Sequence, residues 1–117
     1  MLWRLAALLI LMVPAPVLGI EGRYRIEGSN PGKSGTYQGE VIVRKTGATY
    51  TLAWQLEHVR QVGTGLLSGN VLSVSFMTVG AIGSGVASFE VANDKVRGGT
   101  WTVIGAQVAG TETWTPQ

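Results

Sequence analysis

From Tyr24 onward, apolar and polar residues alternate along nearly the whole chain. A period of two puts successive side chains on opposite faces of a β-strand, whereas a helix would need apolar residues three and four positions apart. The alternating runs stop at Gly, Asn or Asp, which are typical of tight turns. The pattern predicts eight strands, at about residues 22–28, 35–45, 48–58, 61–68, 71–77, 85–92, 96–104 and 107–115.

Most of the predicted connections are two or three residues long, so consecutive strands are expected to pair as antiparallel hairpins. Each turn fixes which residues face one another across the pair. With the turns below, the bulky apolar side chains of all hairpins fall on one face of the sheet. The turns are Thr46-Gly47, Val59-Arg60, Gly69-Asn70, Asn93-Asp94-Lys95 and Gly105-Ala106.

Four aromatic rings face glycines in this register. A ring can lie across the bare backbone of a glycine on the neighbouring strand, and such a glycine permits the strong bend of a closing sheet. The sheet is therefore expected to be curled. The pairs are Trp54 with Gly39 and Gly65, Phe76 with Gly63, Phe89 with Gly99, and Trp101 with Gly110.

Only one face of the predicted sheet is apolar, and the other carries mostly Glu, Arg, Gln, Ser and Thr. A sheet with one solvent-exposed polar face needs no second layer outside it. Closing the sheet into a barrel is the simplest way to bury its apolar face. The predicted fold is all-β, a single antiparallel up-and-down meander of about eight strands curled into a small barrel. The alternative is a two-sheet β-sandwich, although sandwiches usually contain longer cross-over connections.

The first residues have the pattern of an export signal. A basic start at Met1 to Arg4 precedes an apolar stretch from Leu5 to Val13, and small residues at Val17 and Gly19 suit a signal-peptidase site. The apolar stretch is too short to cross a bilayer, which needs about 20 residues. We predict a signal peptide at residues 1–19 and a β-barrel domain at 20–117, exported to the periplasm or secreted, with no stable membrane span after cleavage.

Charge and cysteine content exclude several function classes. The 117 residues contain no cysteine, which excludes disulfides, thiolate metal sites and cysteine nucleophiles. Removing Arg4 with the signal leaves eight of the nine basic residues beside seven acidic residues, a net charge of +1. Because no concentrated basic face is visible, nucleic acid is not an expected partner.

Catalytic chemistry is poorly supported. His58 is the one histidine and lies at a hairpin edge, and Asp94 is the one aspartate and lies in a turn, so a Ser-His-Asp triad has little to build on. The acidic residues are spread singly along the strands and do not form a metal-ligand cluster. We expect a non-enzymatic protein without catalytic residues, metal or cofactor.

Two charged residues, Arg97 and Glu112, are predicted to point into the barrel. They lie diagonally across the last hairpin, where they could pair beside the indole of Trp114, since an unpaired buried charge is costly. Either the pair closes one mouth of the barrel as a salt-bridged lid, or it supplies the polar groups of an aromatic ligand pocket. The third alternative is that the predicted register is wrong and one of the two side chains points to solvent. The candidate ligand-binding residues are Tyr37, Tyr50, Trp54, Arg97, Trp101, Glu112 and Trp114.

Several short segments resemble a group of small exported bacterial β-barrel proteins, mostly uncharacterised, some of which carry the label fibronectin-binding protein. The segments are Gly35-Thr-Tyr37-Gln-Gly39-Glu-Val41-Ile-Val43-Arg44, Tyr50-Thr-Leu52-Ala-Trp54, Gly63-Thr-Gly65, Gly69-Asn70-Val-Leu72-Ser-Val74, Gly99-Thr-Trp101 and Gly110-Thr-Glu112. The resemblance implies a barrel fold and, through the label, surface adhesion, and it supplies no binding residues. In architecture alone the meander is similar to avidin and lipocalin barrels.

Two functions from different classes follow. The first is a binding protein for a small apolar or aromatic molecule or for a protein partner. The second is a surface adhesion protein that contacts an extracellular protein through its outer face. An enzyme is the disfavoured third reading.

Overall fold

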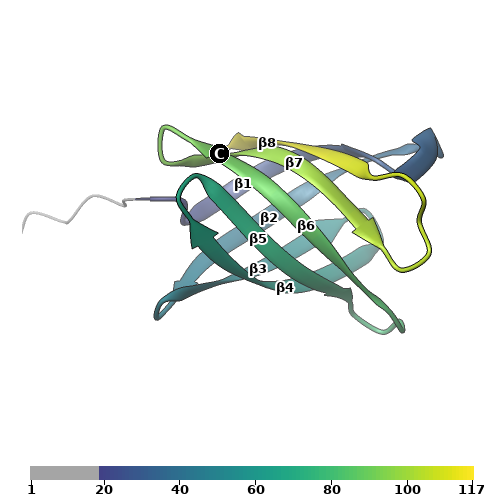
Figure 1. The fold of residues 1–117 in the computed structure, drawn as a ribbon, viewed down its shortest axis with the longest axis horizontal. Coiled ribbons are helices and arrows are strands. Elements are labelled where there is room, and N and C mark those ends of the chain that lie inside the picture. Colours follow the sequence, from purple (N-terminus) through teal and green to yellow (C-terminus); the bar gives the residue numbers. More distant parts are fainter. Residues whose placement is uncertain (1–18) are drawn as a thin grey trace, which may run out of the picture.

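The computed structural model describes residues 19–117, which form a closed barrel of antiparallel strands (Figure 1). Each strand pairs with the next along the chain, and the last pairs with the first, so the sheet has no free edge. The predicted meander barrel is confirmed and the sandwich is excluded. The strands are β1 (Gly22–Ser29), β2 (Thr36–Thr46), β3 (Thr49–Leu56), β4 (Val59–Ser68), β5 (Val71–Thr78), β6 (Ser84–Ala92), β7 (Lys95–Val103) and β8 (Gly110–Pro116), with a short 3₁₀ turn at Pro31–Lys33.

The predicted strand bounds agree with the structure to within two residues, except that β8 begins three residues later than expected. The predicted signal peptide covers residues 1–19, and all of it except Gly19 lies outside the described residues. Alternation explains the agreement, because the apolar positions of each strand are also its buried positions. Along β5, for example, Leu72, Val74 and Phe76 are buried while the residues between them are exposed.

The predicted register is correct for the β4–β5 and β7–β8 hairpins, correct for β6–β7 except beside its turn, and shifted for the other two. Gly63 faces Phe76, Phe89 faces Gly99, and Trp101 faces Gly110, as expected. The β2–β3 pair is displaced by two residues and the β3–β4 pair by four, because their turns lie at residues 47–48 and 57–58. An even displacement keeps every side chain on its predicted face, so the predicted buried positions of these strands are unaffected by the two shifts.

Trp54 is the one ring of the four whose predicted glycine partners are wrong. It faces Val41 on β2 and Gln61 on β4 instead of Gly39 and Gly65. The far side of its indole still packs over a glycine, since a Cβ added to Gly63 would lie 3.0 Å from ring atom Cζ3.

The predicted inward position of Arg97 is wrong. The β6–β7 turn contains two residues, Asn93 and Asp94, both with positive φ, as a tight type I′ hairpin requires. A β-bulge follows, because Val91 faces Val96 whereas Glu90 faces Gly98, which leaves Arg97 as the extra residue.

One inserted residue exchanges the inward and outward positions of the β7 residues between the turn and the bulge. Val96 is therefore fully buried and Arg97 is exposed. The guanidinium Nε of Arg97 donates a 3.1 Å hydrogen bond to the carbonyl oxygen of Ala92. The expected Arg97–Glu112 pair, and with it the salt-bridged lid, therefore does not form.

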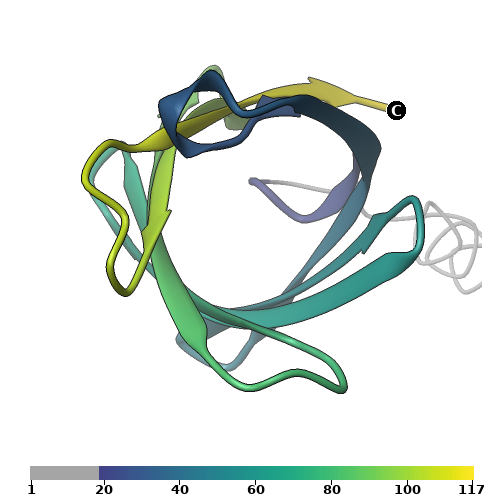
Figure 2. The ribbon, with the colours of Figure 1, turned by 90° about the vertical axis from the view of Figure 1, so that its right-hand side faces the viewer.

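The two ends of the barrel differ. At the end where the described chain begins, Ile20 is 2% exposed and its carbonyl oxygen accepts a 2.7 Å hydrogen bond from the Tyr24 hydroxyl, which in turn accepts one from the backbone N–H of Val96. This end is filled. At the other end, called the mouth below, lie the β1–β2, β3–β4, β5–β6 and β7–β8 connections (Figure 2).

Candidate ligand-binding site

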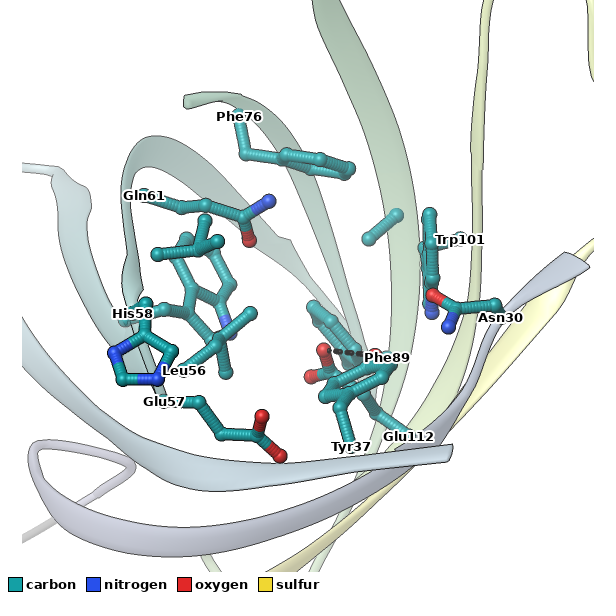
Figure 3. Close-up of a pocket in the computed structure, with 13 residues that line it drawn as sticks. Asn30, Tyr37, Leu56, Glu57, His58, Gln61, Phe76, Phe89, Trp101 and Glu112 are labelled. Atoms are coloured by element: carbon teal, nitrogen blue, oxygen red, sulfur yellow. Dashed lines mark hydrogen bonds between the residues drawn. The ribbon is translucent and has the colours of Figure 1, made fainter. Parts of the chain in front are cut away.

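A cavity of about 320 Å³ occupies the half of the barrel next to the mouth (Figure 3). Its volume lies at the lower end of the range for small-molecule sites. Most of its wall is aromatic or aliphatic, with a few polar groups. The described lining residues are Asn30, Tyr37, Trp54, Leu56, Glu57, His58, Val59, Gln61, Phe76, Ala87, Phe89, Trp101 and Glu112.

Glu112 is the one charged residue in the buried core of residues 19–117, with 8% of its surface exposed. Its Oε2 accepts a 2.7 Å hydrogen bond from the Tyr37 hydroxyl, and its Oε1 accepts a 2.8 Å bond from the indole Nε1 of Trp114. Both carboxylate oxygens therefore have donors from neutral side chains. The carboxylate is held at a fixed place in the cavity wall.

Two glycines flank Glu112 in the sheet. Gly28 on β1 and Gly99 on β7 are the register partners of Glu112 on either side. The ring of Tyr37 lies across Gly28, so a phenol from β2 passes over β1 and reaches a carboxylate on β8. A side chain at position 28 would occupy the volume of that ring.

Burial changes the ionisation of both partners. Desolvation raises the pKa of Glu112 above its usual value, partly offset by hydrogen bonds from Tyr37 and Trp114 and by the nearby Trp54 indole. Desolvation also raises the pKa of the Tyr37 hydroxyl, and the neighbouring Glu112 carboxylate raises it further. Tyr37 is therefore a permanent donor at neutral pH, while Glu112 can change its charge.

Two buried indole N–H groups on this cavity have no hydrogen-bond partner among the described residues, those of Trp54 and Trp101. The Trp54 N–H helps to lower the pKa of Glu112, although it forms no hydrogen bond of ordinary geometry with the carboxylate. Because its Cζ3 edge packs over Gly63, its opposite N–H edge is directed toward Glu112. Buried donors normally find an acceptor, and the acceptors near these two are the protein's own groups, the Glu112 carboxylate for Trp54 and the Tyr37 hydroxyl for Trp101.

The rings around the cavity contact one another edge to face. Ring centroids of Trp54 and Phe76 are 6.1 Å apart, those of Phe76 and Trp101 are 6.1 Å apart, and those of Tyr37 and Trp101 are 6.2 Å apart. Such tilted packing fixes each ring in place and leaves ring faces turned to the cavity.

The β3–β4 turn forms part of the rim. Glu57 adopts a positive φ of 49° there, and its side chain points over the cavity (Figure 3). His58 follows it and is exposed at the same edge. Gln61 lies on the wall, where its side-chain amide donates to Thr78 Oγ1 at 3.3 Å.

The structure places five of the seven residues predicted from the sequence at the cavity or directly beneath it. Tyr37, Trp54, Trp101 and Glu112 line the cavity, and Trp114 lies beneath it as a donor to Glu112. Tyr50 does not, because it sits at the opposite end of β3 beside the residue 47–48 turn. Arg97 does not, because the bulge turns it to solvent.

Sequence reasoning missed Glu57 and His58 because it placed their hairpin turn two residues later, at Val59-Arg60. It named Phe76 and Phe89 as interior residues without assigning them to a pocket. Alternation along β5 and β6 was the signal that could have placed them on the same inner face as Trp101, whose ring centroid lies 6.1 Å from that of Phe76.

No protein-family model matches this chain, and no curated protein matches it significantly. The resemblance to exported barrels and to fibronectin-binding proteins therefore stays a prediction. Within residues 19–117, no helix has the length and apolar character to cross a membrane. The same residues contain no cluster of three His, Asp or Glu side chains that could hold a metal ion.

Proposed function

We propose that this protein is a binding protein that holds one small, largely apolar or aromatic molecule in the mouth half of its barrel. The observation that carries this proposal is an aromatic cavity that has one buried carboxylate, that of Glu112, in its wall. A barrel interior built only for stability would fill this volume with side chains, as the opposite end does.

The size and chemistry of the cavity support a small ligand. The rings of Tyr37, Trp54, Phe76 and Trp101 offer flat apolar surfaces. The polar groups are few and fixed in place, which is the usual composition of a specific small-molecule site. No group among them requires a chemical step, so binding is the proposed activity.

Tryptophan fluorescence excited at 295 nm, read during a screen of aromatic, apolar and sugar compounds, tests this proposal. Occupancy of the cavity changes the surroundings of Trp54 and Trp101, so a bound compound shifts or quenches their emission. A screen in which no compound changes the emission or the melting temperature would contradict a ligand-binding function.

A matched pair of variants places the signal in the cavity. Ala87→Phe puts a ring into the cavity from β6, and Ser88→Phe adds the same ring to the outer face at the next position. We expect Ala87→Phe to weaken binding at least about tenfold and Ser88→Phe to leave it unchanged. Equal binding by both variants would mean that the compound binds elsewhere.

A second candidate, adhesion to an extracellular protein, is favoured by apolar side chains on the outer face of β4, β5 and β6. Val62 and Met77 face each other across β4 and β5 and are 40% and 52% exposed, and Val86 on β6 is 57% exposed. Contiguous exposed apolar groups are typical of interaction surfaces. Binding of the protein to immobilised fibronectin, lost in Met77→Lys and kept in Thr113→Lys, would support this candidate.

We further propose that the barrel acts outside the cytoplasm after removal of residues 1–19. Mass spectrometry of the protein recovered from its native host tests this directly. A mature chain that starts at Ile20 agrees with export, and an intact amino terminus in the cytoplasm contradicts it.

A further inference from the structure

Glu112 has no counter-ion in the part of the chain that the structure describes. The ion pair found among residues 19–117 joins Arg23 to Glu40 on the outer surface, at 3.8 Å. The direct partners of Glu112 are a phenol and an indole, which donate hydrogen bonds but carry no charge. A buried carboxylate of this kind gains most from a cation that enters its own cavity.

The rest of the cavity is also acidic. Glu57 reaches over it from the rim, and the described lining contains neither lysine nor arginine. His58 is the single basic side chain there and is exposed. Two carboxylates without an opposing cation disfavour an anionic ligand and attract a positive one.

The aromatic wall fits the same charge. The cavity that contains the Glu112 carboxylate is also lined by five aromatic rings, those of Tyr37, Trp54, Phe76, Phe89 and Trp101. The face of an aromatic ring is negative, so a cation among these rings gains cation–π attraction as well as its pairing with Glu112. A neutral apolar ligand would gain only the burial of its surface.

We propose that the cavity binds a small organic cation, a protonated amine with an aromatic or aliphatic body. The ammonium group pairs with Glu112, and the body lies between the rings. This inference rests on the proposed small-molecule function and assigns the chemical class of its ligand.

Calorimetric titration with three isosteric probes tests the class. The probes are tyramine, its neutral analogue with a hydroxyl in place of the amine, and the anionic 4-hydroxyphenylacetate. At pH 7.5 we expect tyramine to bind at least about tenfold more tightly than the neutral analogue, and the anion to bind most weakly. If the neutral analogue or the anion binds as tightly as tyramine, the cation proposal is wrong while the small-molecule function stands.

Variants locate the charge. We expect Glu112→Gln to weaken tyramine at least about tenfold and to change the neutral analogue less than about threefold. Glu90→Gln, on the outer face of β6, removes the same charge without touching the cavity and should change neither probe. Equal loss of both probes in Glu112→Gln would show that Glu112 shapes the cavity without recognising a cation. Failure of the unmodified protein to bind any probe or any compound of the wider screen would overturn both proposals.

A pH series gives a second measurement that needs no change at position 112. As pH falls from 8 to 5, protonation of Glu112 should weaken tyramine and leave the neutral analogue unchanged. Tyr37 is the titratable group in contact with Glu112, and Glu57 and His58 share the cavity. The series is repeated in His58→Gln protein, which lacks the imidazole at the rim. An affinity for tyramine that is independent of pH in both proteins would contradict the proposal.

Discussion

The hydroxyl of Tyr37 donates a 2.7 Å hydrogen bond to Oε2 of Glu112 across the backbone of Gly28. The two residues are on β2 and β8, which are both paired with β1 but not with each other. Their contact exists because Gly28 has no side chain, and the Tyr37 ring occupies the place where a Cβ would be. The missing side chain at Gly28 thus allows a residue of β2 to contact a residue of β8 across β1.

Gly28→Ala is therefore expected to displace the Tyr37 ring and break its hydrogen bond to Glu112. The loss should be about 1–3 kcal/mol in the free energy of unfolding, measured by urea denaturation. Gly65→Ala is the matched control, because a Cβ there meets only side-chain methyl groups at 3.1–3.3 Å and should cost less. Equal stability losses in the two variants would contradict the role given to Gly28.

Glu112→Ala removes the acceptor of two buried donors, the Tyr37 hydroxyl and the Trp114 indole. We expect the free energy of unfolding to fall by about 2–4 kcal/mol, since buried donors without partners are costly. Glu112→Gln keeps one carbonyl oxygen and should lose less. Glu90→Ala, exposed on β6, serves as the control and should stay within about 0.5 kcal/mol. A melting temperature unchanged in Glu112→Ala would contradict these contacts.

The raised pKa of Glu112 predicts a specific pH dependence. Burial favours the protonated carboxyl in the folded protein, so the contribution of Glu112 to stability is present below its unfolded pKa of about 4.5 and is lost as pH rises through the folded pKa. The stability difference between the unmodified protein and Glu112→Gln should therefore fall as pH rises from 4.5 to 8. The other titratable groups cancel in this difference, because both proteins contain them. Chemical denaturation across this range measures it, and a difference that grows with pH would reverse the sign and contradict the argument.

The fold could be predicted from the sequence because strand alternation and turn residues act locally. Gly69 and Asn70 fix the β4–β5 hairpin, and the core of β5 follows from period two alone. The β3–β4 turn at Glu57 and His58 contains no glycine, so its position was wrong, but the even shift preserved the buried face.

The site was only partly predictable. Glu112 could be placed inside by alternation along β8, whereas its true partner Tyr37 becomes visible only when β1 and β8 close the barrel. The register of a hairpin relates only neighbouring strands. Arg97, the predicted inward charge on the adjacent strand, was therefore the expected partner of Glu112. A bulge cannot be distinguished from a longer turn by length alone, and this one reversed the face of Arg97.

The bulge supplies the last prediction. Arg97→Ala should change the free energy of unfolding by less than about 0.5 kcal/mol, because the side chain is exposed and holds a single surface hydrogen bond. Gly98→Ala should cost several times more. Its φ of 139° is strained for any residue with a side chain, and the added Cβ would overlap the carbonyl oxygen of Glu112. Urea denaturation of the two variants measures the contrast. A large loss in Arg97→Ala with a tolerated Gly98→Ala would restore an inward arginine and remove the bulge from this fold.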